Sequence, residues 1–322
     1  MGPPALRRGE HETAGAHSLK ALDPERPIRE ADIFQTTGFR VYDVSSHSVK
    51  YAVRMHVVKV NELFTDGEAY ERLMGRWSRM VGERFLDWLG VPKGLRWLDV
   101  GCGNGAFTEE IVARCAPATV TGIDPSDEQL AFARRRPSVK LAQFQVGDAQ
   151  RLPFGDRSFD VAIMALVLSF LPDPAKAVSE MARVVRPGGW IATYMWDVPG
   201  GGSPVTMIYD AMESLGSALP VRPNPAASRL EAMQDFWETA GLEAIETRVI
   251  RIPVTYANFD DFWDSNTVPI GPQGKVIAGM SVDTREQLRT RLREYVPAAS
   301  DGRIIYQSFA NAVKGRVPGS YG

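Results

Sequence analysis

The chain has 322 residues, of which 44% are hydrophobic and 24% charged, the balance of an ordinary globular protein with a sizeable core. Its net charge of −2 gives no electrostatic case for a nucleic-acid partner or an acidic membrane surface. Cys102 and Cys115 are too few for a disulfide framework and no Cys/His cluster has zinc-like spacing, so we expect no metal and a reducing, cytoplasmic setting.

The first 64 residues differ in composition from the rest of the chain. Residues 1–31 are rich in Pro, Gly, Ala and charged side chains, which predicts weak order, and they lack the apolar core of a signal peptide. Val57–Val60 is largely β-branched, but no partner strand is evident. We therefore expect an N-terminal extension over residues 1–64, without an assigned function, and a folded domain over residues 65–322.

The apolar spacing then predicts a helix, followed by alternating strands and helices. Apolar residues recur every three or four positions, at Leu73, Trp77, Met80, Val81, Phe85, Trp88 and Leu89, as on one face of an amphipathic helix. We expect strands at Arg96–Val100, Thr119–Asp124, Val139–Val146, Phe159–Leu166 and Gly189–Trp196, and helices at Ala106–Cys115, Ser126–Arg136 and Asp173–Val185. This alternation predicts a parallel sheet with helices on both faces.

Local signals support the boundaries of these elements. Ser126 and Gln129 have the spacing of a capping box, and Asp173 precedes a proline as the N-cap of a helix does. The longest apolar run, Val161–Leu171, is far shorter than the roughly 20 residues that cross a bilayer, so we expect no membrane span.

The pattern changes after Asp197. Gly/Pro-rich loops come first, and the later segments predict a helix at Ser228–Ala240, a strand within Glu243–Thr255, two helical stretches in Phe259–Val296 around a loop at Pro269–Gly274, and a last strand at Ile304–Val313. We expect a core over residues 65–197, a helical cap and sixth strand over 198–303, and the last strand and tail over 304–322.

Parallel α/β sheets bind ligands at the carboxyl ends of their strands, so the residues that follow each strand are the candidates for a ligand site. Leu98–Phe107 follows the first strand and contains alternating glycines that precede a helix. Glycine allows a tight turn and lets a ligand approach the backbone, and Asp99 places a carboxylate beside it that suits a cationic amine. A tight turn without a ligand is the alternative.

Two further carboxylates follow the next strands. Asp124 lies about 20 residues beyond the glycine loop, where an acidic residue commonly holds ribose hydroxyls; the alternative is a helix-entry residue. Asp148 ends the third strand, where a carboxylate can accept a hydrogen bond from an exocyclic amine such as that of adenine; the alternative is a surface turn. Together the three sites favour a nucleotide-like ligand.

These segments together resemble a known family. Leu98–Phe107, Gly122–Ser126, Gly147–Phe154 with Ser158–Val161, and Arg186–Gly189 resemble, in order and spacing, the motifs of class I S-adenosylmethionine-dependent methyltransferases, in particular the type 11 group related to quinone-biosynthesis methyltransferases. The resemblance covers about residues 70–196. It implies a Rossmann-like, doubly wound α/β sheet, mostly parallel with an antiparallel last strand, and a helical cap inserted in the C-terminal part.

The resemblance also implies roles for individual residues toward S-adenosylmethionine. Asp99, Gly101 and Gly103 would line its methionine part, and Asp124 would bind the ribose with Pro125 near the adenine. Asp148 and the backbone of Ala149 would bind the adenine, and Leu166 would offer its backbone to the methionine amine. Tyr70 and Arg76 would belong to a covering helix, with Arg76 either pairing with the methionine carboxylate or lying on the surface beside a core tryptophan.

The sequence says less about the acceptor. All four histidines precede the domain, and Leu168–Leu171 lacks the histidine that many relatives carry after the fourth strand, so no general base is assigned; Asp197 fits a loop-capping role better. Aromatic residues that could wall an acceptor, or simply pack in the cap, are Tyr194, Trp196, Phe259, Phe262 and Trp263. We expect a small-molecule acceptor, no nucleic acid, and a monomer or homodimer.

Two other functions remain open from the sequence. A nucleotide-dependent oxidoreductase would carry the glycine pattern GxGxxG, whereas Gly101–Gly105 reads GCGNG. A non-catalytic S-adenosylmethionine-binding protein could keep the same fold without turnover.

Overall fold

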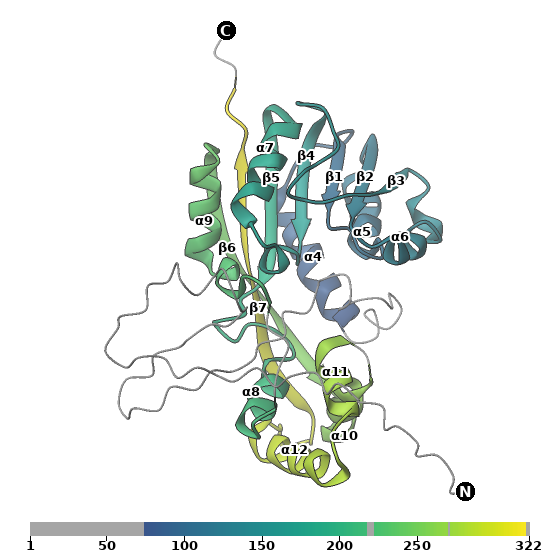
Figure 1. Cartoon of the computed structure of the whole chain (residues 1–322), viewed down its shortest axis with the longest axis vertical. Helices are drawn as coiled ribbons and strands as arrows, with labels where there is room; N and C mark the ends of the chain where they lie inside the picture. The colour runs from purple at the N-terminus through teal and green to yellow at the C-terminus, as the bar shows by residue number, and fades with distance from the viewer. Residues whose placement is uncertain (1–73, 218–221, 270, 320–322) are drawn as a thin grey trace, which may run out of the picture. The chain divides into compact units, whose positions relative to one another are not determined.

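The computed structural model of the chain describes residues 74–217, 222–269 and 271–319, and these contain a seven-stranded sheet (Figure 1). The strands are β1 (Arg96–Val100), β2 (Thr119–Asp124), β3 (Ala142–Val146), β4 (Phe159–Ala165), β5 (Val185–Trp196), β6 (Glu243–Tyr256) and β7 (Ile304–Arg316). They lie in the order β3-β2-β1-β4-β5-β7-β6. β1 to β5 are parallel, and β7 is antiparallel to β5 and β6, which confirms the predicted fold class.

Helices cover both faces of this sheet. The core helices are α4 (Arg76–Leu89), α5 (Ala106–Cys115), α6 (Asp127–Ala133), α7 (Pro174–Val184) and α9 (Leu230–Thr239). Trp97 of β1 belongs to the apolar cluster that contains α4 and α5, whereas Leu98 belongs to the cluster that contains α7 and α9. Because successive side chains of a strand point to opposite faces, Asp99 lies on the α4–α5 face.

A helical cap follows the long strands at the sheet edge. β6 and β7 continue past the end of β5, because Trp196 pairs with Ala310 while the pairing of β6 with β7 extends to Tyr256 and Ile304. Around these ends lie α8 (Thr206–Ser214), α10 (Phe259–Thr267), α11 (Gly271–Ala278) and α12 (Val282–Tyr295) (Figure 1). The cap therefore lies beyond the carboxyl ends of the parallel strands. None of the helices in the described ranges is long and apolar enough to cross a membrane.

Several predicted boundaries hold and others are wrong. The Oγ of Ser126 accepts from the backbone N–H of Gln129, and Asp173 caps α7 as predicted. The third strand begins at Ala142, because Pro137–Val139 forms a 3-10 turn that buries Val139. In the cap, α8 was not predicted, and α11 occupies most of the expected Pro269–Gly274 loop.

The predicted turn at Arg186–Gly189 lies inside β5. Val185 already pairs with Phe159 of β4, and the ladder shifts register before the next pair. Gly188 takes a φ of 72°, and its N–H donates to the carbonyl of Val317 at 2.8 Å. Hydrogen bonds to the distant C-terminal segment therefore hold this stretch, including its left-handed Gly188, within the sheet, which local sequence signals could not indicate.

Candidate functional site

The glycine loop after β1 is tied to the end of β2. The backbone N–H groups of Gly101 and Cys102 both donate to the carbonyl of Ile123, at 2.7 and 3.0 Å. Gly101 and Gly103 have φ values of 73° and 51°, in the left-handed region that favours glycine. A Cβ at Gly101 would lie 2.5 Å from Val167, whereas a Cβ at Gly103 would meet no atom of the described residues within 4 Å. The loop is therefore packed at Gly101 and open at Gly103.

Asp99 is a buried carboxylate beside this loop. Its side chain is fully buried, and its Oδ2 accepts a hydrogen bond of 2.6 Å from the hydroxyl of Thr108 on α5. Its Oδ1 has no hydrogen-bond partner within the part of the chain that the structure describes. Burial, opposed by the Thr108 hydrogen bond and helped by the charge of Asp124, raises the pKa of Asp99 to about 7. An unpartnered buried acceptor of this kind suits a cationic donor.

Asp124 joins the first two loops. Its Oδ2 accepts from the backbone N–H of Gly103 and its Oδ1 from that of Ser126, both at 2.9 Å. Burial raises the pKa of Asp124, while the two backbone donors oppose that shift. The side chain is half-buried, and Pro125 beside it is exposed. Each carboxylate oxygen can accept a second hydrogen bond, as a pair of ribose hydroxyls would require.

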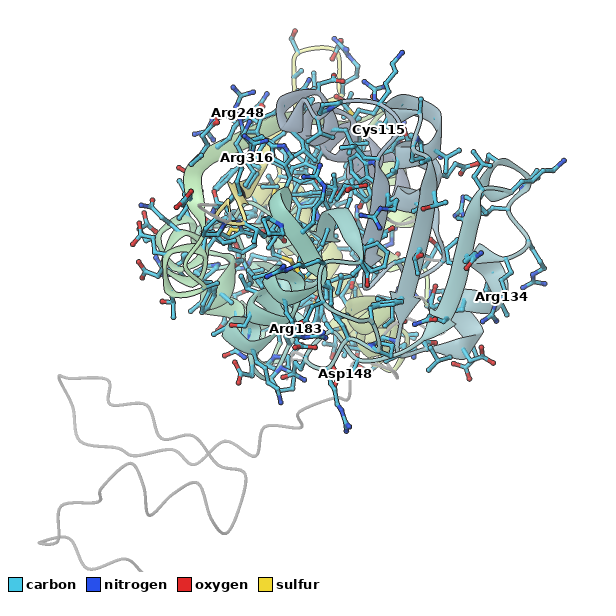
Figure 2. The ribbon with its side chains drawn as sticks, turned by 90° about the horizontal axis from the view of Figure 1, so that it is seen from above. Cys115, Arg134, Asp148, Arg183, Arg248 and Arg316 are labelled. Atoms are coloured by element: carbon cyan, nitrogen blue, oxygen red, sulfur yellow. The ribbon has the colours of Figure 1, made fainter. Side chains whose placement is uncertain are left out.

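The turn after β3 lies next to Asp124. The N–H of Gly147 donates to the carbonyl of Asp124 at 3.1 Å. Asp148 is exposed at the margin of the ribbon in Figure 2, and its Oδ1 accepts from the backbone N–H of Gln150 at 2.9 Å. Ala149 is buried. The structure thus places the predicted adenine-binding residues beside the predicted ribose-binding residue.

Leu166 follows β4 in an unusual backbone conformation. Its φ is 62°, which for a residue with a Cβ costs roughly 1 kcal/mol. Its N–H donates to the carbonyl of Tyr194 at 2.9 Å, and the next residue, Val167, is the one that would meet a Cβ at Gly101. Strain of this kind persists where the surrounding structure holds it, and here it lies against the glycine loop.

Arg76 lies on the cap side of the sheet. It is exposed at the start of α4, and its guanidinium lies 4.0 Å from the ring centroid of Trp77 and 4.8 Å from that of Tyr256. Its pairing with the methionine carboxylate stays a prediction. Tyr70 lies outside the described residues, as does the predicted extension over residues 1–64.

Of the predicted acceptor residues, Phe259 is half-buried, and the buried ones are Tyr194, Trp196, Phe262 and Trp263. Phe262 is fully buried with its ring edge-on to Tyr256 at 5.2 Å, and Trp263 is buried beneath the guanidinium groups of Arg285 and Arg289. Both side chains pack within the cap, and contact with an acceptor stays a prediction for them. Trp196 ends β5 with 2% exposure, and its indole N–H has no partner among the residues described.

Asp197 has the capping role expected for it. Its Oδ1 accepts from the backbone N–H of Gly200 at 2.9 Å, and its carbonyl accepts from Gly202 at 2.7 Å. The loop that follows then packs against β7, because the N–H of Phe309 donates to the carbonyl of Gly202 at 2.9 Å.

Sequence reasoning missed two serines next to this loop. Ser203 and Ser308 are buried, and the hydroxyl of each has no hydrogen-bond partner in the described ranges. Neither serine belongs to a sequence motif, so sequence spacing could not single them out. The available signal was the alternation of β7, which puts Ser308 on the same face as Tyr306 and Ala310.

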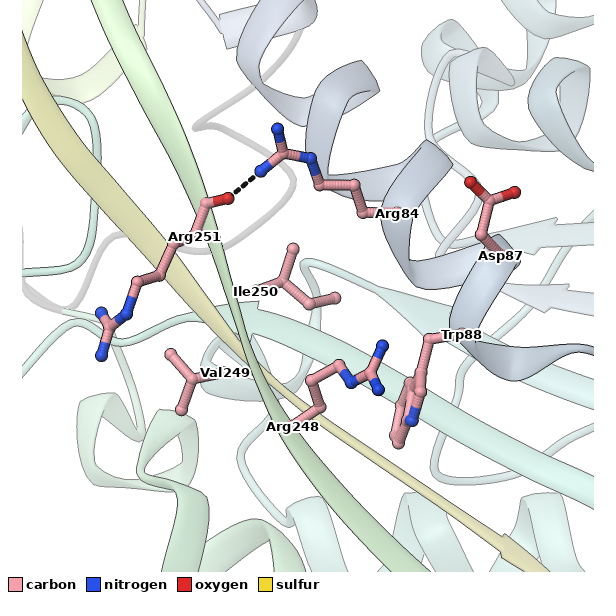
Figure 3. A pocket seen from close by; sticks show the side chains of 7 residues that line it. All are labelled: Arg84, Asp87, Trp88, Arg248, Val249, Ile250 and Arg251. Carbon is pink, nitrogen blue, oxygen red and sulfur yellow. Dashed lines mark hydrogen bonds between the residues drawn. The ribbon is translucent and has the colours of Figure 1, made fainter.

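A separate pocket of about 500 Å³ lies between α4 and β6 (Figure 3). Its lining residues are Arg84, Asp87, Trp88, Arg248, Val249, Ile250 and Arg251. The guanidinium of Arg84 donates to the carbonyl of Arg251 across it. This pocket shares no residue with the loops at the carboxyl ends of β1, β2 and β4.

Comparison with known proteins identifies a common family. The family described as "Methyltransferase domain" matches residues 98–193. The chain is 32% identical to the O-methyltransferase cnsE of Penicillium expansum over 238 residues, which are 72% of this chain and 79% of that protein. It is 37% identical over 111 residues to a fatty-acid O-methyltransferase of Mycolicibacterium smegmatis and 36% over 158 residues to a demethylmenaquinone methyltransferase of Renibacterium salmoninarum.

The matched lengths differ among these relatives. The last two matches cover 33% and 49% of this chain, and 40% and 62% of the relatives, so the chain spans less than two thirds of each.

Among solved structures, a methyltransferase-like protein of Bacillus halodurans has a TM-score of 0.50 at 16% identity and covers 74% of this chain and 98% of that one. A phosphoethanolamine N-methyltransferase of Haemonchus contortus, in complex with S-adenosyl-L-methionine, has a TM-score of 0.50 at 19% identity. The match covers 84% of this chain and 62% of that one. At these identities the structures show the fold.

Proposed function

Because the chain belongs to the class I S-adenosylmethionine-dependent methyltransferases, we propose that it transfers the methyl group of S-adenosylmethionine to an oxygen atom of a small-molecule acceptor. The observation that carries the proposal is Asp99, a buried carboxylate whose Oδ1 lacks a partner in the described chain, beside a glycine loop that is open at Gly103. A bound ammonium group would supply the missing donor.

The residues at the carboxyl ends of the strands fit this cofactor. We assign Asp99, Gly101 and Gly103 to its methionine part, with the strained backbone of Leu166 facing the same group. Asp124 has free lone pairs on both carboxylate oxygens for a ribose diol.

The adenine is assigned to the turn after β3. Asp148 would accept a hydrogen bond from its exocyclic amine, and the backbone of Ala149 and the ring of Pro125 would complete its surroundings. This assignment rests on the bond between Gly147 and Asp124, which puts the turn next to the ribose position.

When bound, S-adenosylmethionine supplies an activated methyl group. The chain would hold the acceptor in line with the S–CH₃ bond and exclude water. Transfer of the methyl carbon from sulfur to the acceptor oxygen would leave S-adenosylhomocysteine, and the acceptor's proton would be released to bulk solvent with the products. No residue is assigned as general base, since Asp197 caps its own loop.

Relatives support an oxygen acceptor of low molecular weight. Two of those compared are named O-methyltransferases, and the match with cnsE over 238 residues extends well beyond the 98–193 region. The net charge of −2 gives no support for a nucleic-acid acceptor. We propose a monomer or homodimer. An oxidoreductase or a non-catalytic role finds no support among these relatives.

Titration calorimetry of the full-length protein tests the cofactor assignment. We expect S-adenosylmethionine and S-adenosylhomocysteine to bind in a 1:1 ratio and NAD to give no heat of binding. Binding of NAD without binding of either sulfur compound would support the oxidoreductase instead.

A further inference from the structure

The end of α6 packs directly against the glycine loop that follows β1. A Cβ at Gly105 would lie 2.9 Å from the Cβ of Ala133 and 3.5 Å from the Cδ of Arg136. Glycine at this position therefore allows the two segments to approach closely. Residues 133–136, which end α6 and form the turn after it, are thus in contact with the loop that we assign to the cofactor.

Arg136 holds one peptide group of this loop. Its Nε donates to the backbone carbonyl of Asn104 at 2.7 Å. The N–H of the same peptide group, which belongs to Gly105, donates to the carbonyl of Cys102 at 2.9 Å. Both polar groups of this peptide are hydrogen-bonded, so a rotation of the peptide plane would break two bonds, one of them to a charged donor.

The guanidinium of Arg136 also binds the first turn of α5. Its Nη1 donates to Oε2 of Glu109 at 2.8 Å, and the hydroxyl of Ser138 donates to the other oxygen of that carboxylate. The side chains of Arg136 and Glu109 are 15% and 26% exposed, so solvent screens this ion pair less than a fully exposed one. The backbone N–H of Glu109 donates to the carbonyl of Gly105 at 3.0 Å. Arg136 therefore connects α6, the glycine loop and the start of α5.

The local sequence directs Arg136 toward the loop. A proline follows it, which disfavours helical backbone at the preceding residue, and Arg136 is extended, with a φ of −67° and a ψ of 124°. The two arginines before it bind elsewhere. Arg134 donates to the carboxylate of Asp127, and Arg135 donates to the carbonyl four residues earlier in its own helix. These neighbours therefore serve as matched comparisons for Arg136.

We propose that Arg136 is a positioning residue for S-adenosylmethionine, and that it holds the glycine loop in the geometry that accepts the cofactor. The inference rests on the proposed methyltransferase function. Asp124 holds the loop at the N–H of Gly103, and Arg136 holds it at the carbonyl of the next residue. The affinity for a ligand falls in proportion to the fraction of chains whose site has the competent geometry, so loss of this hold lowers the affinity without deletion of a cofactor contact.

Titration calorimetry of the full-length protein with S-adenosylhomocysteine measures this effect. We expect Arg136→Ala to bind it about tenfold more weakly than the wild type, as the loss of one charge-assisted hydrogen bond would predict. Arg136→Lys keeps a charged donor within reach of the Asn104 carbonyl, and we expect it to bind about threefold more tightly than Arg136→Ala. Arg135→Ala is the control, because Arg135 is exposed and its guanidinium lies over Phe132 of the same helix. It should bind as the wild type does.

Hydrogen–deuterium exchange of the protein without cofactor tests the hold on the loop separately. We expect faster exchange over residues 101–106 in Arg136→Ala than in the wild type, because the N–H of Gly105 loses its protection when the peptide rotates. Arg135→Ala should exchange there as the wild type does. Exchange over β6 should be the same in all variants, which separates a local change from a loss of overall stability.

The outcomes distinguish this inference from the proposed function. Wild-type affinity of Arg136→Ala would overturn the inference while the proposed function stands. Equal affinities of Arg136→Lys and Arg136→Ala, unchanged exchange of the loop, or faster exchange over β6 as well as the loop would each overturn it too. If S-adenosylhomocysteine does not bind the wild type, the proposed function is contradicted and the role toward the cofactor falls with it, while the exchange experiment still decides whether Arg136 holds the loop.

Discussion

The backbone N–H of Gly103 donates to the carboxylate of Asp124 at 2.9 Å, and this bond joins the turn after β1 to the end of β2. The same carboxylate accepts from Ser126 at the start of α6. Asp124 therefore fixes the position of two loops, and each of its oxygens can accept one further hydrogen bond.

Replacement of Asp124 tests its assignment to the ribose. We expect Asp124→Ala to weaken S-adenosylhomocysteine binding by about 10- to 100-fold, because a charge-assisted acceptor for two hydroxyls is lost. Titration calorimetry measures the change, and circular dichroism checks that the fold persists. Asp127→Ala is the control, since Asp127 is exposed and its salt bridge among the described residues is with Arg134. Equal affinity of wild type and Asp124→Ala would remove the ribose assignment.

Replacement of Asp99 tests its unusual ionisation. Burial raises the pKa of Asp99 to about 7 in the folded chain, whereas an unfolded aspartate titrates near 4. The folded state therefore keeps a proton that the unfolded state has lost, and the contribution of Asp99 to the free energy of unfolding falls as pH rises from about 4 to 7. Between pH 5 and pH 8 this fall amounts to about 3 kcal/mol.

The Asp99→Asn variant should lack this pH-dependent loss of stability, because asparagine does not ionise. Urea unfolding at pH 5 and pH 8 without cofactor measures it, and the wild type should lose more stability than the variant as pH rises. The variant should also bind S-adenosylhomocysteine more weakly, because an amide is a poorer partner for an ammonium group. If the free energy of unfolding changes equally with pH in both proteins, the raised pKa of the buried Asp99 is contradicted.

The two loop glycines should respond differently to alanine. Gly101→Ala places a Cβ 2.5 Å from Val167 at a positive φ, and we expect it to lower the free energy of unfolding by more than about 2 kcal/mol. Gly103→Ala meets no described atom, so we expect about 1 kcal/mol from backbone strain alone together with loss of cofactor binding. Thermal unfolding measures the change in stability, and calorimetry measures the change in cofactor affinity. Wild-type cofactor affinity of Gly103→Ala would show that no ligand lies against Gly103.

The aspartate of the fourth-strand motif has a structural role. Asp160 accepts from the guanidinium groups of Arg96 and Arg186 and from the backbone N–H of Arg96, and these partners outweigh its partial burial and hold its pKa below the usual range. A depressed pKa adds stability above about pH 4, and that stability is lost as pH falls below it. We expect Asp160→Asn to cost about 2 kcal/mol at pH 7.

The pH dependence distinguishes this role from a packing defect. The difference between wild type and Asp160→Asn in urea unfolding should shrink as pH falls from 5 to 3. Asp301→Asn is the control, because Asp301 and its partner Arg303 are both about half exposed, at 50% and 53%. A difference that does not change with pH would contradict the ion-pair explanation.

The elements that follow local rules could be predicted from the sequence. The strands at Arg96–Val100 and Thr119–Asp124 and the helix Ala106–Cys115 have the predicted bounds, because short apolar runs, glycine spacing and helix starts are local signals. Val139 was expected to begin the third strand, but it lies in a proline-initiated turn that buries it. The α11 helix was missed because Pro and Gly there predict a loop.

The residues that we propose for the cofactor could be named from the sequence because they belong to motifs, whereas no motif marks an acceptor site. Ser203 and Ser308 are separated by more than 100 residues, and only the pairing of the loop after β5 with β7 brings their segments together. Trp196 was proposed as a wall for the acceptor, but its unpartnered N–H depends on what surrounds the indole in space. Sequence spacing carries no information of that kind.

Methyl transfer itself is tested most directly with S-adenosylmethionine that carries a deuterated methyl group. The full-length wild type and Asp124→Ala are incubated with a small-molecule extract, and products are analysed by mass spectrometry. We expect a labelled small molecule and an equal amount of S-adenosylhomocysteine from the wild type, with strong loss of both in the variant. Binding of S-adenosylmethionine without any labelled small molecule, or transfer of the label to a macromolecule, would contradict the proposed function.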